Sequence, residues 1–248
     1  MSESTAPEQN VLVSVRNVNK VFKKADEEVY ALRDVSLDVY REEYLSIMGP
    51  SGSGKTTLFN MVGALDKPSS GEVRVGGQSL PKLSSAELSY FRCKHIGYVF
   101  QTYNLIPWLT ARGNVMLPMT FLGVSDEEAN RRAVECLEMV GLSHRLDHTP
   151  GECSGGQQQR IAIARALAND PAIILADEPT ANLDQKTGEE IIQLLKQLCQ
   201  QEGVTVITAT HDHKMLAASD RIVWIKGGRV DRIEDVSKLN IKIGGVKL

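Results

Sequence analysis

The sequence predicts an α/β fold with a mainly parallel sheet, an antiparallel β subdomain near the N-terminus and an inserted α-helical subdomain. Residues 172–176 and 204–209 are near-continuous apolar or β-branched runs, which is typical of parallel strands covered on both faces. Short alternating segments before residue 80 indicate the antiparallel part. Between residues 101 and 149 this strand pattern disappears. A chain of 248 residues is long enough for one such domain with an insertion.

The N-terminal part opens with a polar, acidic segment, residues 1–10, which we expect to be a disordered tail. Alternating segments at residues 11–15, 30–32, 35–39 and 71–77 predict short strands. A buried strand over 44–48 leads into a glycine-rich loop. The helix that begins near Thr57 is expected to end at Asp66, Lys67 and Pro68.

Three helices are predicted in the second half of the chain. Ser125 and Glu128 have the spacing of a capping box, and Gly141 is expected to end the helix that they start. A second helix follows residue 154 and stops before Pro171, and a third spans 186–201. We therefore expect a domain over residues 11–235 with a helical subdomain at about 102–165, and a short C-terminal tail over 236–248.

Composition excludes several classes of function. A net charge of −3 and a pI near 6.0 give no basic field for nucleic acid. The sequence contains neither a signal peptide nor an apolar run of membrane-spanning length, so we expect a cytoplasmic protein without a direct membrane span. The four cysteines are scattered without a CxxC pair, which favours reduced thiols over zinc or disulfides; they are Cys93, Cys136, Cys153 and Cys199.

The loop after the buried strand matches the phosphate-binding pattern GxxxxGK[ST] of P-loop nucleotide hydrolases. It consists of Gly49, Pro50, Ser51, Gly52, Ser53, Gly54, Lys55, Thr56 and Thr57. Glycines let backbone N–H groups face phosphate oxygens, Lys55 can reach the terminal phosphates, and Thr56 offers a hydroxyl to Mg²⁺. A Gly/Ser-rich surface loop is the plain alternative, but the order of strand, loop and helix favours a nucleotide site.

Two adjacent carboxylates, Asp177 and Glu178, directly follow the apolar run over residues 172–176. The carboxyl end of a parallel strand is where α/β sheets bind ligands. We expect Asp177 to hold Mg²⁺ through water and Glu178 to polarise the water that attacks the terminal phosphate. The alternative is a pair of solvated acids at the start of a loop.

A second glycine-led site precedes a helix and consists of Ser154, Gly155, Gly156 and Gln157. A hydroxyl and bare amides at a helix N-terminus form an anion site, although the same residues also make a good N-cap. One nucleotide does not obviously need two such sites.

Six motifs in order resemble those of the nucleotide-binding subunit of ATP-binding cassette (ABC) transporters, and the likeness covers about residues 11–235. They are GPSGSGKTT, Gln101 in YVFQTYNLIP, the signature CSGGQQQR, IILADEPT, ANLD ending at Asp184, and His211 in TATHDH. The resemblance implies an ATPase with ATP and Mg²⁺ as ligands. The signature departs from the family at Cys153, where leucine is usual; cysteine is a small apolar substitute.

The resemblance also implies roles for single residues. Two copies would pack head to tail, so that Ser154, Gly155, Gly156 and Gln157 contact the ATP bound to the other copy. Gln101 would reach Mg²⁺ and the attacking water, His211 the γ-phosphate, and Asp184 the partner subunit. Phe22 falls where the family stacks an aromatic ring on adenine. Without the family, His211 is more often a structural or surface histidine, Gln101 an ordinary polar residue and Phe22 a core side chain.

Longer stretches, such as IMGPSGSGKTTLFNMVGALDKPSSGEV, look most like the lipoprotein-release and macrolide-export branch of bacterial cassettes. That branch implies a separate or fused transmembrane permease, with the ATPase held on the cytoplasmic face of the inner membrane. We expect export or extraction of a lipoprotein, lipid or hydrophobic compound. The alternative is a regulatory cassette that transmits conformational change to an envelope or cell-division complex.

A third class, soluble cassettes of DNA repair or translation, would carry a long coiled-coil insertion or a second cassette, and this sequence has neither. Residues 106–109 include Trp108 and form a candidate surface for docking the permease. A buried, purely structural Trp108 is the alternative.

Overall fold

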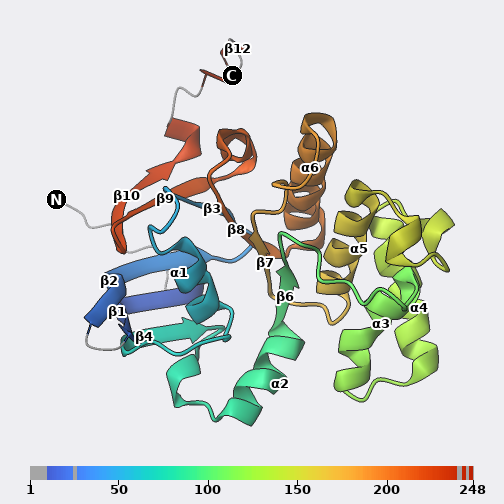
Figure 1. Cartoon of the computed structure of the whole chain (residues 1–248), viewed down its shortest axis with the longest axis horizontal. Coiled ribbons are helices and arrows are strands. Elements are labelled where there is room, and N and C mark those ends of the chain that lie inside the picture. The colour runs from blue at the N-terminus through green and yellow to red at the C-terminus, as the bar shows by residue number, and fades with distance from the viewer. Residues whose placement is uncertain (1–9, 25–26, 239–241, 244–245, 248) are drawn as a thin grey trace.

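The structure is a computed structural model that describes residues 10–24, 27–238, 242–243 and 246–247. All but one residue of the predicted N-terminal tail and part of the predicted C-terminal tail lie outside these ranges. A six-stranded sheet, a four-stranded antiparallel sheet and flanking helices make up the fold (Figure 1). The predicted α/β class, with its antiparallel N-terminal sheet and its group of inserted helices, is confirmed.

The antiparallel sheet has the order β2 (Glu27–Tyr40), β1 (Val11–Lys24), β4 (Ser70–Val75) and β5 (Gln78–Ser79). The two segments predicted at 30–32 and 35–39 belong to the single strand β2. Asn17 and Asp34 adopt left-handed φ angles of 48° and 50°, and the Asn17 amide donates to the Asp34 carboxylate at 2.9 Å. The pairing register between β1 and β2 shifts at these two residues, as it does at a β-bulge. Each strand therefore continues, although the alternation of apolar and polar side chains is interrupted there.

The six-stranded sheet has the order β10 (Arg229–Asp235), β9 (Arg221–Lys226), β3 (Tyr44–Met48), β8 (Thr205–Thr210), β7 (Ile173–Asp177) and β6 (Ile96–Val99). Five of these strands run parallel, and β10 pairs with β9 in the antiparallel sense. Strands β3, β7 and β8 were expected from their apolar runs. The sequence analysis did not predict β6, β9 or β10.

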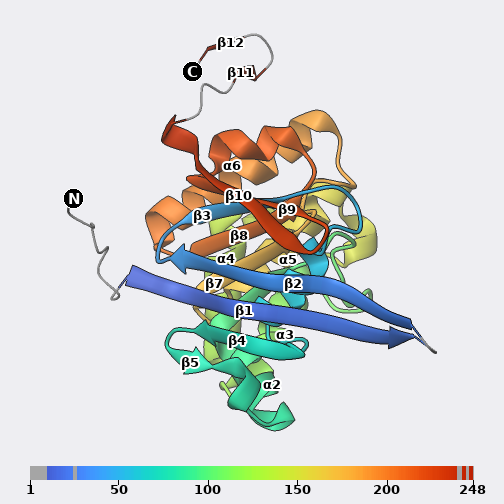
Figure 2. The same ribbon diagram turned by 90° about the vertical axis from the view of Figure 1, so that its left-hand side faces the viewer.

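Apolar residues on both faces of the central strands explain their continuous hydrophobicity. Ile173 and Leu175 of β7 belong to a core shared with α1 (Lys55–Val62) and the antiparallel sheet. Ile174 and Ala176 belong to a second core beneath the helices on the opposite face. Figure 2 shows the antiparallel sheet lying across one side of the six-stranded sheet, with the helices behind. Both cores hold the carboxyl ends of the parallel strands in place.

The helices that follow β6 gather on one side of the molecule (Figure 1). They are α3 (Ala111–Phe121), α4 (Asp126–Met139) and α5 (Gly155–Leu167). Helix α2 (Ser85–His95) precedes β6, and α6 (Gln185–Glu202) connects β7 to β8. The ends of α6 agree with the prediction to within one residue, because Gly203 stops it with a φ of 65°. The remaining elements are short: Leu80–Lys82, Ser143–Arg145, Pro150–Glu152, His213–Ala218 and Val236–Lys238 are 3₁₀ turns, and Lys242–Ile243 pairs with Val246–Lys247.

One predicted helix end and one predicted capping interaction differ from the structure. Helix α1 ends at Val62 rather than near Pro68, because Gly63 and the left-handed Ala64 turn the chain away. The capping box at Ser125 is only half formed. Its hydroxyl accepts from the amide of Glu128 at 3.3 Å, but the Glu128 carboxylate pairs with Arg131 instead of returning to the cap.

All four cysteines are free thiols. Cys136, Cys153 and Cys199 are buried, and burial raises the pKa of Cys136 and of Cys199 to about 11.

Candidate functional site

One edge of the parallel sheet collects most of the predicted site residues. The glycine loop follows β3, Gln101 comes two residues after β6, Asp177 ends β7, and His211 follows β8. These four strands run in the same direction, so their carboxyl ends meet at one edge. A cavity of about 620 Å³ lies there, lined by Ala31, Pro50, Ser51, Gly52, Gly54, Lys55, Thr56, Thr57, Gln101, Asp177, Glu178 and His211.

The glycine loop needs bare Cα atoms at both of its ends. A Cβ at Gly49 would lie 2.2 Å from the Ile225 carbonyl oxygen. Gly54 has a φ of 108°, and a Cβ there would lie 2.7 Å from the carbonyl oxygen of Ala31. Each glycine therefore lets the loop pass close to a neighbouring backbone, which fixes the position of the amides that start α1.

Two side chains of the loop can bind an anion. The Lys55 ammonium donates to the carbonyl oxygens of Gly49 and Pro50 at 2.8 and 3.2 Å, and forms no ion pair with a carboxylate among the described residues. The buried hydroxyl of Ser53 has no hydrogen-bond partner in the described part of the chain. An ammonium held only by neutral oxygens, an orphan hydroxyl and a helix N-terminus fit the phosphates of a nucleotide.

Asp177 lies between the loop and the next acid. Burial and the neighbouring Glu178 raise the pKa of Asp177, whereas the charge of Lys55 and a hydrogen bond from Thr56 lower it. A half-buried carboxylate beside a second one is electrostatically costly until a cation joins them. A carboxylate and a threonine hydroxyl are oxygen donors of the kind that Mg²⁺ takes, so these two residues fit the predicted metal.

Glu178 is held by its main chain and by both carboxylate oxygens. Its φ is 46°, in the left-handed region, and its amide donates to the Ala209 carbonyl oxygen at 2.9 Å. Its Oε1 lies 2.8 Å from Nδ1 of His211, and its Oε2 accepts from the Thr210 hydroxyl at 3.1 Å. Because a carboxylate only accepts, Nδ1 carries the proton in the His211 contact. Thr210 did not emerge from the sequence analysis.

Gln101 connects this edge to the segment that precedes α6. Gln101 belongs to the lining of the cavity, and its carbonyl oxygen accepts from the Asn182 side-chain amide at 2.8 Å. Asp184 caps α6, accepting from the Thr187 amide at 3.1 Å and from the Thr187 hydroxyl at 2.6 Å. These bonds lower the pKa of Asp184. Asp184 therefore has a local structural function whether or not it contacts a partner.

The second glycine site lies at the start of α5 and does not line the cavity described above. Ser154 and Gln157 form a complete capping box, with bonds of 3.3 and 3.0 Å. A Cβ at Gly156 would lie 2.4 Å from the Thr187 methyl, so glycine there lets α5 approach α6. Cys153 is buried just before the cap and packs in the core beneath these helices. The plain N-cap reading is thus correct as far as the single chain goes.

Two predicted aromatic contacts lie outside the cavity. Phe22 on β1 is 46% exposed, faces Val29 across the strand pair, and has the Lys20 ammonium 5.1 Å from its ring centroid. It is not a core residue. Trp108 is 77% exposed, so the alternative of a buried structural tryptophan is wrong.

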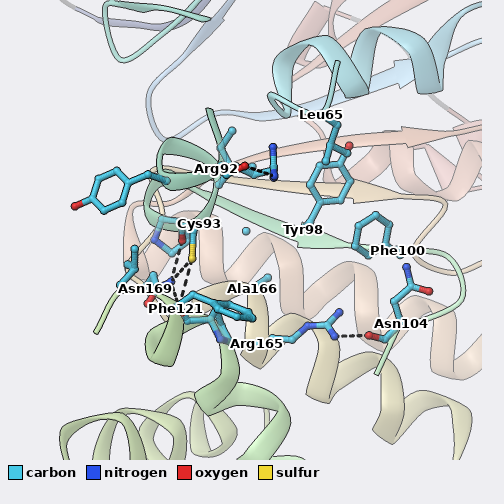
Figure 3. Close-up of a pocket in the computed structure, with 17 residues that line it drawn as sticks. Leu65, Arg92, Cys93, Tyr98, Phe100, Asn104, Phe121, Arg165, Ala166 and Asn169 are labelled. Carbon is cyan, nitrogen blue, oxygen red and sulfur yellow. Dashed lines mark hydrogen bonds between the residues drawn. The ribbon is translucent and has the colours of Figure 1, made fainter. Parts of the chain in front are cut away.

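A second concavity, which we call the Arg165 groove, lies between α2, β6, α3 and α5 (Figure 3). It encloses about 660 Å³ and its lining includes Leu65, Tyr90, Arg92, Phe121 and Arg165. The three apolar or aromatic members of this set are exposed. Arg165 donates to the carbonyl oxygens of Tyr103 and Asn104, and Arg92 to that of Ala64. Within the described residues, neither guanidinium pairs with a carboxylate.

Comparison with known proteins gives a consistent picture. Residues 32–181 match the family model described as ABC transporter. The chain is 50% identical over 227 residues to the uncharacterised ABC transporter ATP-binding protein MJ0796 of Methanocaldococcus jannaschii, covering 90% of this chain and 97% of that one. It is 45% identical over 221 residues to the macrolide export ATP-binding/permease protein MacB of Photorhabdus laumondii, covering 89% of this chain but only 34% of MacB.

A solved structure of the M. jannaschii protein aligns with a TM-score of 0.83 at 49% identity, covering 91% of this chain and 99% of that one. It is described as a dimeric, post-hydrolysis state of the cassette bound to ADP and phosphate. Among the helices of the described residues, we find none with the length and apolarity of a membrane span.

Proposed function

The chain belongs to the ABC transporter family, as an ATP-binding and ATP-hydrolysing cassette, and we propose that two copies of it close head to tail around two ATP molecules. The position of the signature carries this proposal. Ser154, Gly155, Gly156 and Gln157 start α5, whereas the cavity at the glycine loop has none of them in its lining. A second copy would bring its signature to that cavity, which is why one nucleotide needs two glycine sites.

In this proposal different residues of the chain have separate roles in ATP binding and hydrolysis. Amides of the glycine loop and the Lys55 ammonium bind the phosphates. Thr56, Asp177 and Gln101 would hold Mg²⁺, which supplies positive charge next to the terminal phosphates. Glu178 accepts a proton from the attacking water, and His211 lies beside it to contact the γ-phosphate. Phe22 stacks on the adenine, and Asp184 contacts the partner subunit.

We further propose that the cassette drives a transmembrane permease and is held by it on the cytoplasmic face of the inner membrane. The likeness to MacB, whose name joins an ATP-binding part to a permease, supports this partner. The cargo would be a lipoprotein, lipid or hydrophobic compound. We propose that residues 11–235 form the domain that binds and hydrolyses ATP, with the helical subdomain at about 102–165.

The Arg165 groove is the proposed seat of the permease. Three exposed apolar side chains, Leu65, Tyr90 and Phe121, belong to the lining of a concavity that also holds two guanidiniums without a carboxylate partner among the described residues. A cytoplasmic segment with apolar side chains around one carboxylate complements this chemistry. Exposed Trp108, which follows Asn104 of the groove by four residues, would extend the same contact.

Purification of the native complex, with identification of its membrane chains by mass spectrometry, tests the proposal. We expect a permease in stoichiometric amount, and reconstituted vesicles that move a lipid, lipoprotein or drug only while ATP is hydrolysed. A complex that contains a permease but moves none of these cargoes while ATP is hydrolysed would favour the regulatory alternative. A complex without any membrane chain would contradict both.

A further inference from the structure

Thr210 ends β8 and has no assigned part in the reaction. Its side chain is fully buried, and its hydroxyl makes two hydrogen bonds. The hydroxyl accepts from the Asp212 amide at 3.0 Å and donates to Oε2 of Glu178 at 3.1 Å. The first bond occupies the hydroxyl as an acceptor, which leaves its proton directed at the carboxylate.

From this geometry we infer that Thr210 is a positioning residue that orients the Glu178 carboxylate toward the attacking water. The inference rests on the proposed role of Glu178 as the base. The inference adds that the Glu178 carboxylate is oriented by a residue of β8, the neighbouring strand, rather than by β7, the strand that Glu178 follows.

Two observations support an orienting function over a merely structural one. Glu178 lies in the left-handed region, where the main chain of a glutamate is strained. Its amide is tied to Ala209, the residue immediately before Thr210. The main chain and the side chain of Glu178 are therefore anchored to consecutive residues of β8. The strain is sustained by bonds that fix where the carboxylate lies.

The other contact of the carboxylate leaves the orientation to Thr210. His211 bonds to Oε1, but its side chain is 72% exposed, and in the proposed reaction it turns to the γ-phosphate. A buried hydroxyl on a strand residue has no comparable freedom. During turnover, the Thr210 bond is the contact that stays.

The test compares Thr210→Val, which keeps the shape and removes the hydroxyl, with Thr210→Ser, which restores it. We expect Thr210→Val to lower kcat by about 10-fold to 100-fold, the usual effect of losing a hydrogen bond to a charged group, while KM for ATP changes little. The melting temperature should fall by a few degrees, because the Asp212 amide also loses its acceptor. Thr210→Ser should recover most of kcat. A kcat of Thr210→Val within twofold of the parent would overturn the inference.

Thr208→Val is the matched control. Thr208 is a buried residue of the same strand, but its hydroxyl bonds to Ser46 at 2.8 Å and not to Glu178. This variant should keep the parent kcat. If both valine variants lose kcat equally, the loss reflects the strand and the inference fails.

Single-turnover measurements with Glu178→Gln complete the cycle. If Thr210 acts through Glu178, adding Thr210→Val to Glu178→Gln should slow the residual reaction no further. Fully additive losses would overturn the inference by showing that Thr210 acts elsewhere. A Glu178→Gln variant that keeps turning over would instead remove the proposed base itself.

Discussion

At the scale of single residues, the glycine loop shows how a local pattern can define a site. Its spacing is contained in nine consecutive residues, so the sequence was enough to predict it. The structure adds the reason for particular glycines. Gly54 combines a left-handed φ with a backbone oxygen 2.7 Å from where a Cβ would lie.

Gly54→Ala should therefore lower ATP affinity by at least about 10-fold, because left-handed strain and the contact with Ala31 together cost about 1–3 kcal/mol and displace the first amides of α1. Equilibrium calorimetry with ATP measures the affinity. Gly123→Ala is the control, since Gly123 has a φ of 75° in open space. It should lose stability but bind ATP normally. Equal ATP affinity in both variants would show that the close approach at Gly54 is unimportant.

Thr210 shows which kind of site residue a sequence pattern cannot predict. The bond from its hydroxyl to Glu178 joins positions 32 residues apart, and it exists only because β7 and β8 pair in one particular register. Strand register is set by packing of the whole sheet. A threonine at the end of a β-branched strand gives no separate signal, so the sequence analysis passed over it.

At the scale of elements, strongly periodic segments were predicted well and irregular ones were not. The stripe of α6 and the buried runs of β7 and β8 each follow one period from end to end. Strand β2 was divided in two because Asp34 interrupts its alternation. Strand β6 has four residues and was hidden in a helix-rich region. The domain boundaries built on these elements remain predictions.

Asp184 has two functions to separate, the observed cap of α6 and the proposed contact with a partner. Asp184→Asn keeps a good N-cap and should change the free energy of unfolding by only a few tenths of a kcal/mol, while weakening ATP-dependent dimerisation. Asp184→Ala should also lose about 1 kcal/mol of stability. Denaturant unfolding and sedimentation measure the two effects.

Ser125→Ala is the matched control, because Ser125 caps α4 in the same way and is not a proposed dimer contact. It should lose about 1 kcal/mol of stability and dimerise like the parent. If Asp184→Asn dimerises as well as the parent chain, Asp184 is only a cap.

At the scale of the whole molecule, the Arg165 groove lets the proposed docking be tested by charge. Phe121, 73% exposed at the end of α3, belongs to its lining. Phe121→Asp should reduce permease association by at least about 10-fold, because the new charge is buried on docking and repels the expected carboxylate. Phe121→Lys should reduce it less. Both variants should bind ATP normally.

Trp108→Ala should also lower association, and Ile233→Asp, at an exposed position on β10, should not. Pull-down with the purified permease measures all four variants. Unchanged association of Trp108→Ala would remove Trp108 from the interface. Unchanged association of Phe121→Asp would remove the groove.

The structure of a single chain gives the least direct information about the proposed dimer. Ser154, Gly155, Gly156 and Gln157 have a complete local explanation as the start of α5, and nothing in their own geometry requires a nucleotide. Their second function depends on a surface supplied by another copy. That second function is supported by the order of motifs in the sequence, by the position of these residues outside the cavity lining, and by the dimeric state of the M. jannaschii cassette.

The most direct test is the solution mass of the Glu178→Gln variant, measured by light or X-ray scattering with ATP and Mg²⁺. Blocked hydrolysis should hold both ATP molecules between the two copies, so the account predicts a mass twice that of the chain, returning to the single value when ATP is withheld. A sample saturated with ATP that still scatters as single chains would contradict it.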